Sequence, residues 1–136
     1  MSYALASALQ TAVFQALYTE PAITAAVGSA IYDAVPAGDV PDMYISLGPE
    51  LATDASDKSG QGAVHKFTLS VHSDAPGFAK AKEIAGAVCD ALVDADLPMN
   101  RGRLVALRFD RASASRTDAG KGRKIDLRFA ARVEDS

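Results

Sequence analysis

The segment 102–133, GRLVALRFDRASASRTDAGKGRKIDLRFAARV, decides the fold. In its first part Val105, Leu107 and Phe109 alternate with smaller or charged residues, and apolar residues recur at every second position over 125–133. Since successive side chains of a strand leave opposite faces, this period of two predicts two half-buried antiparallel strands. The glycine within residues 118–120 is typical of a three-residue hairpin loop. We therefore predict a long β-hairpin over residues 102–134.

The predicted hairpin has a definite register. The register sets the two aromatic residues opposite each other and brings all large apolar side chains onto one face. The other face then carries the charged residues. The expected cross-strand pairs are Thr117 with Lys121, Phe109 with Phe129 and Val105 with Val133.

The hairpin also carries most of the positive charge. Residues 101–136 contain ten of the fourteen Lys and Arg residues and five acidic ones, whereas residues 1–100 contain four basic and twelve acidic residues. One interpretation is that charges on polar strand faces provide solubility and protect the sheet edge. The alternative is that the hairpin reaches a negatively charged surface, either another protein or a nucleic acid backbone.

The composition is that of one ordinary globular domain, spanning residues 1–136. The chain is 49% hydrophobic and 23% charged, and its length is sufficient for a single core. Its only cysteine is Cys89, so no disulfide forms within the chain. The N-terminus does not have the pattern of a signal peptide, and no apolar run is long enough to span a membrane. We expect a soluble protein of a reducing compartment, or of a particle assembled there.

The other elements follow from their periodicity. Apolar residues at helical spacing predict helices over 2–18 and 78–95, and a short helix at 22–27 follows the first of them. Strands are predicted at 43–51 and 64–73. The fold class is therefore α+β: a single domain with a mostly antiparallel four-stranded sheet, two main helices packed on one face and a long C-terminal β-hairpin.

Residues 53–62 form the most polar segment of the chain. They include no apolar residue larger than alanine, so the segment cannot bury itself. Such a segment is expected to be a mobile loop that projects beyond the sheet. Loops of this kind suit ordered assembly, because they order only when a partner stabilises them.

No group of residues predicts catalysis or metal binding. His65 and His72 are seven residues apart on one strand, so they point to opposite faces and cannot chelate one metal together. His65 falls on the apolar face, where a hydrogen-bonded sheet or interface residue is expected. Cys89 falls on the buried side of a helix, and Asp54 and Asp57 lack the spacing of an EF-hand. We expect a binding protein, not an enzyme, with no cofactor and no metal.

Three short segments, in their order, resemble a known family. They are AVGSAIYDAVP (residues 26–36), PDMYISLG (41–48) and FTLSVHS (67–73), and they follow a leucine-rich first helix. Together they resemble the tail terminator, or tail completion, proteins of long-tailed phages and their relatives in gene transfer agents. The Trp-Ser or similar pair that often ends the third segment in that family is replaced here by Val71-His72-Ser73.

The resemblance implies an architectural function and an α+β fold. Members form a hexameric ring that caps the head-proximal end of the tail tube, ends tail polymerisation and joins the tail to the head connector. The implied partners are further copies of the chain, the tail tube protein and a connector or stopper, with DNA passing only transiently and no membrane. The implied location is the tail neck of a virion or phage-like particle assembled in the bacterial cytoplasm.

Two sets of site residues follow as hypotheses. The polar loop and the hairpin tip are expected to contact the tail tube or the connector, and strand arginines are expected to line a channel through which DNA passes weakly bound. The docking candidates are Asp54, Ser56, Asp57, Lys58, Arg116, Lys121, Arg123 and Lys124. The channel-facing candidates are Arg108, Arg128 and Arg132.

Other functions stay open from the sequence. The chain could be a different neck component, such as a stopper or connector. It could be a small nucleic-acid-binding module that uses the basic hairpin, although no aromatic residues interleave with the basic ones for stacking. A small-ligand enzyme with the polar loop as its lid would need convergent polar residues, which the sequence does not indicate.

Overall fold

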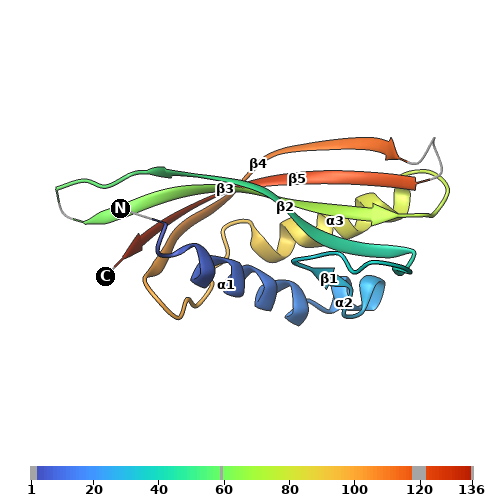
Figure 1. Cartoon of the computed structure of the whole chain (residues 1–136), viewed down its shortest axis with the longest axis horizontal. Helices are drawn as coiled ribbons and strands as arrows, with labels where there is room; N and C mark the ends of the chain where they lie inside the picture. Colours follow the sequence, from blue (N-terminus) through green and yellow to red (C-terminus); the bar gives the residue numbers. More distant parts are fainter. Residues whose placement is uncertain (1–2, 59, 118–121, 136) are drawn as a thin grey trace.

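The computed structural model describes residues 3–58, 60–117 and 122–135, which form an elongated, twisted sheet with helices on one face (Figure 1). The architecture is α+β, as predicted from the sequence. In chain order the elements are α1 (Ala6–Thr19), α2 (Pro21–Val27), β1 (Ile31–Tyr32), β2 (Met43–Asp54), β3 (Gln61–Ser73), α3 (Ala79–Leu92), β4 (Arg103–Thr117) and β5 (Gly122–Asp135).

The sheet has five strands in the order β1-β2-β3-β5-β4, so the expectation of a four-stranded sheet was wrong by one strand. The additional strand β1 is two residues long and pairs parallel to β2, whereas the other neighbours are antiparallel. A strand this short has no periodicity to detect. It is held from the helical side, because the Tyr18 hydroxyl donates a hydrogen bond to the carbonyl oxygen of Ile31 at 2.9 Å.

The core lies between the helices and the central strands β3 and β5. Alternate residues of these strands point at the helices, and the register sets large side chains opposite one another. The cross-strand pairs at the centre are Phe67–Phe129, Leu69–Leu127 and Val71–Ile125. All of these side chains are buried, as are the apolar faces of α1 and α3. This is the alternating pattern from which the strands were predicted.

Strand β4 departs from the predicted hairpin register on both sides of the Phe109–Phe129 pair. Phe109 does face Phe129, but the ladder shifts by one residue between Leu104 and Ala106 and again between Phe109 and Arg111. Each shift is a β-bulge, which adds a residue to one strand only. Alternation in the sequence cannot reveal such an insertion.

These shifts change the predicted pairs and the predicted apolar face. Val133 pairs with Leu104, not with Val105, and Thr117 pairs with Gly122, while Lys121 lies outside the described residues. Val105 and Phe109 are 41% and 46% exposed, so the large apolar groups of β4 are not all buried. The residues 118–120 of the expected loop also lie outside the description.

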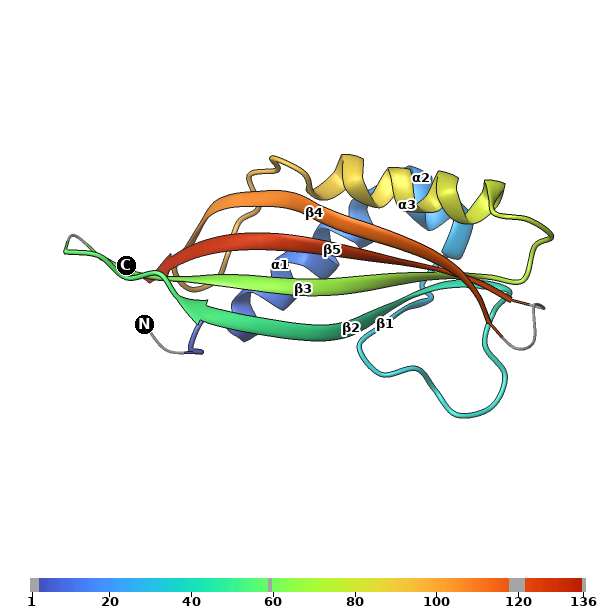
Figure 2. The same ribbon diagram turned by 90° about the horizontal axis from the view of Figure 1, so that it is seen from above.

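The polar segment 53–62 is partly strand and not a loop throughout. Residues 53 and 54 end β2 and pair with Val64 and Ala63, and residues 61 and 62 begin β3. The prediction failed here because backbone ladders need no apolar side chains. The β2–β3 hairpin extends well beyond the helices at one end of the sheet, as both views show (Figures 1 and 2). Between its strands, Asp57 and Gly60 form an isolated bridge.

Candidate interaction surfaces

The helix-free face of the sheet is rich in basic residues. Residues that pair across neighbouring strands share a face, so the register identifies the side chains that lie opposite to the helices. Asp126 and Glu134 are acidic residues on this face, and the Asp126 carboxylate accepts a hydrogen bond from Ser70 at 2.5 Å. The basic residues on this face are Lys66, Arg103, Arg108, Arg111, Lys124, Arg128 and Arg132.

One ion pair anchors the middle of this surface. Arg128 Nε donates to the Asp110 carboxylate at 2.5 Å, and Asp110 stands at the second bulge of β4. That hydrogen bond is the main reason that the pKa of Asp110 lies below its ordinary value, with the nearby charges of Lys66 and Arg111 adding to the effect. The carboxylate therefore stays ionised, and it neutralises only part of the surrounding positive charge.

The three channel-facing candidates share this surface. Arg108 pairs with Ala130, which lies between Arg128 and Arg132 on the helix-free side of β5. Arg108 is exposed, whereas Arg128 is held by Asp110 and Arg132 donates to the carbonyl oxygen of Ala55 at 3.2 Å. The set is therefore one continuous basic surface, with its arginines held to different degrees.

The docking candidates are divided between the two ends of the sheet. Asp54, Ser56, Asp57 and Lys58 belong to the β2–β3 hairpin end, where Ser56 donates to the Asp54 carboxylate at 2.7 Å. The basic candidates belong to the opposite end, where β5 begins beside the end of β3. Strand β3 has 13 residues, so the two groups lie roughly 40 Å apart. One contact patch cannot include both.

The basic end is partly fixed by packing. The Arg123 guanidinium lies over the Phe78 ring, 5.4 Å from its centroid, and Lys124 Nζ lies 3.6 Å from the Asp126 carboxylate. Arg116 is exposed, and Lys121 lies outside the described residues. Among the predicted basic residues that the structure describes, Arg116 is therefore the most available for a partner, while Arg123 has a structural role.

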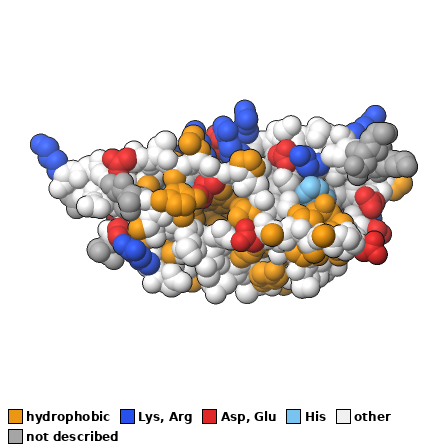
Figure 3. Space-filling model, viewed as in Figure 1, with side chains coloured by type: hydrophobic (Ala, Val, Ile, Leu, Met, Phe, Trp, Pro, Cys, Tyr) orange, Lys and Arg blue, Asp and Glu red, His pale blue; other side chains and the backbone are white. Residues whose placement is uncertain are grey.

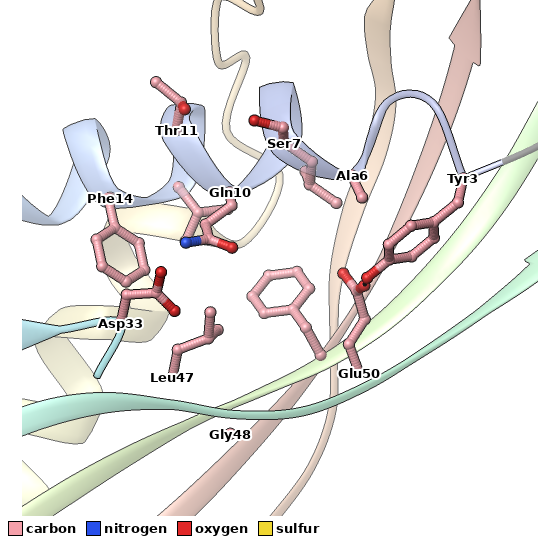
Figure 4. A pocket seen from close by; sticks show the side chains of 13 residues that line it. Tyr3, Ala6, Ser7, Gln10, Thr11, Phe14, Asp33, Leu47, Gly48 and Glu50 are labelled. Atoms are coloured by element: carbon pink, nitrogen blue, oxygen red, sulfur yellow. Dashed lines mark hydrogen bonds between the residues drawn. The ribbon is translucent and has the colours of Figure 1, made fainter. Parts of the chain in front are cut away.

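A cavity of about 530 Å³ lies on the helical side of the sheet, between α1 and the middle of β2, around residues 47–50 (Figure 4). Phe14, Leu47 and Phe67 give it apolar walls, and Asp33 and Glu50 add two carboxylates. Figure 3 shows acidic side chains set among hydrophobic ones on this side of the molecule. The cavity suits an amphipathic group with a positive charge.

A buried histidine supports one wall of this region. His65 is 0% exposed, and its Nδ1–H donates to Glu50 Oε2 at 3.3 Å, while its Nε2 has no hydrogen-bond partner among the described residues. Tyr3 stacks on the His65 ring and donates its hydroxyl to Glu50, which raises the pKa of Tyr3. The expectation of a hydrogen-bonded sheet histidine is confirmed. Its acidic partner was not predicted.

A second, smaller hollow of about 300 Å³ lies between α3 and the edge strand β4. We call it the α3–β4 groove, and its apolar lining includes Phe109, Ala112 and Ala114 from β4, and Ala85, Gly86 and Cys89 from α3. Burial raises the pKa of the Cys89 thiol, with a smaller effect from Asp90. Cys89 is partly buried against the core, so it is an inert lining residue at neutral pH.

Within the described residues, no three His, Cys, Asp or Glu side chains gather in a way that could hold a metal ion. Over the same residues, none of the helices has the length and apolar character needed to cross a membrane.

Comparison with known proteins identifies the family. The model of the family described as tail completion protein gp17 matches residues 11–134, which is most of the chain. The chain belongs to the tail completion protein gp17 family. A chain in the solved structure titled "Virion of native gene transfer agent (GTA) particle" is 58% identical, with a TM-score of 0.91 over 98% of this chain and 99% of that chain. A search of curated proteins finds no match.

In this member of the tail completion family, sequence reasoning missed the cavity and the groove. Both form where residues far apart in the chain meet: Tyr3 and Glu50 around the cavity, and Gly86 and Phe109 around the groove. Two signals were present, namely Glu50 in an otherwise apolar stretch of β2 and a glycine within the α3 pattern. Neither signal predicts a hollow until the sheet register is known.

Proposed function

We propose that this protein forms a ring that caps the head-proximal end of the tail tube in a virion or phage-like particle, ends tail polymerisation and joins the tail to the head connector. The observation that carries the proposal is the family match over residues 11–134, together with the 58% identical chain in a gene transfer agent virion. The role is structural, and the ring is proposed to be a hexamer that resides in the tail neck.

The shape of the subunit suits a ring with three kinds of surface. The sheet has two edges, two ends and one helix-free face, and these lie in different directions (Figure 2). In a ring whose axis runs along the strands, the edges would contact neighbouring copies and the ends would face the tube and the connector. The basic helix-free face would line the passage.

The two ends of the sheet are proposed to bind two different partners. The β2–β3 end offers Asp54, Ser56, Asp57 and Lys58, and the β4–β5 end offers basic residues that include Lys124. A cap that terminates a tube and receives a connector needs one contact surface for each. We infer that one end serves the tail tube and the other end serves the connector.

A weak contact with passing DNA is favoured by the basic helix-free face. Arg108, Arg128 and Arg132 share it, and the pairing of Arg128 with Asp110 limits its attraction for phosphate. Tight binding would hinder passage, so the expected affinity for short DNA is low and falls steeply with salt. High-affinity binding that persists at high salt would instead indicate a nucleic-acid-binding module.

The deciding experiment is imaging of particles from a strain that lacks this gene, with tail lengths measured. Overlong tails without heads are expected, because the missing cap no longer stops polymerisation. Tails of normal length that fail to join heads would indicate a stopper or connector function instead. Normal transducing or infectious particles would contradict an assembly function altogether.

A further inference from the structure

The two edges of the sheet carry opposite charge. The segment 31–54, which includes β1, the following loop and β2, contains five acidic residues and no Lys, Arg or His. Strand β4, at the opposite edge, contains four arginines and one aspartate. The sheet order β1-β2-β3-β5-β4 is what separates these two segments by the full width of the sheet.

Several of these charges are available to a neighbour. Arg108, Arg116, Asp33 and Asp39 are exposed and form no salt bridge or side-chain hydrogen bond with any residue in the described ranges. Surface charges that meet no partner inside the molecule retain their full attraction for an oppositely charged surface.

Both edges are also unsuited to simple strand addition. Strand β2 has a register shift between Leu47 and Glu50 that contains Gly48 and Pro49, and proline has no N–H to donate. Strand β4 has two register shifts of its own. Bulges and proline interrupt a continuous backbone ladder, so contact at these edges must depend on side chains.

Apolar surface accompanies the charges on both sides. The α3–β4 groove runs beside the basic edge, with Phe109 46% exposed. The acidic edge presents Val35 and Leu51, which are 45% and 64% exposed. An apolar centre with a charged rim is the usual anatomy of a protein–protein interface.

We propose that the β4 edge of one copy docks against the β1–β2 edge of the next copy, head to tail, with the α3–β4 groove receiving apolar residues of that neighbour. The partner is a second copy because the two edges complement each other in charge. A contact between two different patches of one surface forms a ring when the rotation from copy to copy closes after a full turn. The inference rests on the proposed ring and specifies its subunit interface.

Rotational symmetry further suggests which levels of the two edges meet. A rotation about an axis parallel to the strands does not change the position of a residue along that axis. The register shows which residues of neighbouring strands share the same position along it. Arg116 pairs with Arg123, which pairs with Ser73, which in turn pairs with Met43. Arg116 and Met43 therefore share one position along the axis, and Asp42 directly precedes Met43. Arg116 is therefore expected to approach the acidic loop that ends at Asp42 of the neighbouring copy.

The test is an exchange of charge between the two edges, in the strain that lacks the gene. One variant carries Arg116→Glu, and the other carries Asp39→Lys with Asp42→Lys. Each alone puts like charges together at every interface and is expected to lower the number of joined particles by about tenfold or more. Supplied together, the two variants restore opposite charges at every interface of an alternating ring, so joined particles should return.

Two results would overturn the proposal. One is that either variant alone supports joined particles like the wild type, and the other is that the mixture fails although both variants unfold at the wild-type temperature. A tail defect on gene deletion combined with either result would leave the proposed function in place and remove only this interface. Absence of any tail defect on deletion would remove both.

A second variant tests the groove without endangering the fold. Gly86→Gln fills the α3–β4 groove, and replacing an exposed helical glycine favours the helix, so this variant should fold at least as stably. Joined particles are expected to fall about tenfold. Glu83→Gln, on the same helix but outside the groove, is the matched control and should assemble normally. Normal assembly of Gly86→Gln would contradict docking in the groove.

Discussion

The imidazole of His72 lies flat against the Tyr44 ring, with centroids 4.2 Å apart and planes inclined by 10°. Its Nε2 is 2.9 Å from the hydroxyl oxygen of Ser46. Burial lowers the pKa of His72 below the ordinary 6.5, helped by the positive charge of Lys124 and opposed by Asp126. The folded protein therefore favours the neutral ring.

A lowered histidine pKa predicts a loss of stability in mild acid. The unfolded state binds a proton at pH 6.5, whereas the folded state binds one only at lower pH. The contribution of His72 is thus fully present above pH 6.5 and declines as the pH falls through the folded pKa. Urea unfolding between pH 7.5 and pH 5 should show this decline, and a smaller one in His72→Phe, which keeps the stack without titrating. Equal slopes in both proteins would contradict the prediction.

The aromatic core predicts a large difference between two phenylalanines. Phe129 is fully buried and contacts both Phe67, at 5.7 Å between centroids, and Phe109, at 6.2 Å. Phe129→Ala should lower the free energy of unfolding by about 3–5 kcal/mol. Phe109→Ala is the control, since the side chain is 46% exposed, and should cost about 1–2 kcal/mol. Chemical denaturation measures both, and similar losses would mean that the packing described for Phe129 is wrong.

Two glycines are expected to respond in opposite directions to alanine. Gly102 has a φ of +65°, and a Cβ there would stand 2.6 Å from the carbonyl oxygen of Glu134 and 2.9 Å from Leu5. Gly102→Ala should therefore destabilise by about 2–4 kcal/mol. Gly86 lies within α3 with open space around it, and Gly86→Ala should stabilise by about 0.5–1 kcal/mol. Thermal unfolding measures both effects, and a change in stability of the same sign in both variants would contradict the prediction.

The thiol of Cys89 is expected to react slowly. Burial raises its pKa, so little thiolate is present at pH 7.5, and the chain has no other cysteine. Labelling with a maleimide should be slow in the native protein and fast in denaturant. If the α3–β4 groove is occupied in particles, labelling there should be slower still. Equal rates in free protein and in particles would argue against occupancy of the groove.

The sequence predicted the fold class because its strongest signals are local. Alternation over residues 125–133 located β5, and helical spacing located α1 and α3. What it could not predict depends on contacts between distant segments. The bulge at Asp110 and the pairing of β1 with β2 have no local signature, although they determine which side chains are exposed.

The sequence predicted the chemical type of the candidate surfaces better than their positions on the sheet. The excess of arginine in the C-terminal third correctly indicated a charged surface, and the register then brought Arg108, Arg128 and Arg132 together. The docking residues were predicted as exposed polar segments that contact the tail tube or the connector, and the structure places Asp57 and Arg116 at opposite ends of the sheet. Polarity identifies exposed segments, but only the strand lengths show how far apart they lie.

The register shifts in β4 have a geometric consequence for any closed assembly. Bulges bend a strand and increase its twist, and both effects change the orientation of one edge of the sheet relative to the other. If neighbouring copies join edge to edge, the relative orientation of the two edges determines the rotation from one copy to the next, and this rotation must divide a full turn into a whole number of steps. The number of subunits would then be encoded in the curvature of a single chain, and deleting Asp110 should change how many copies close the circle.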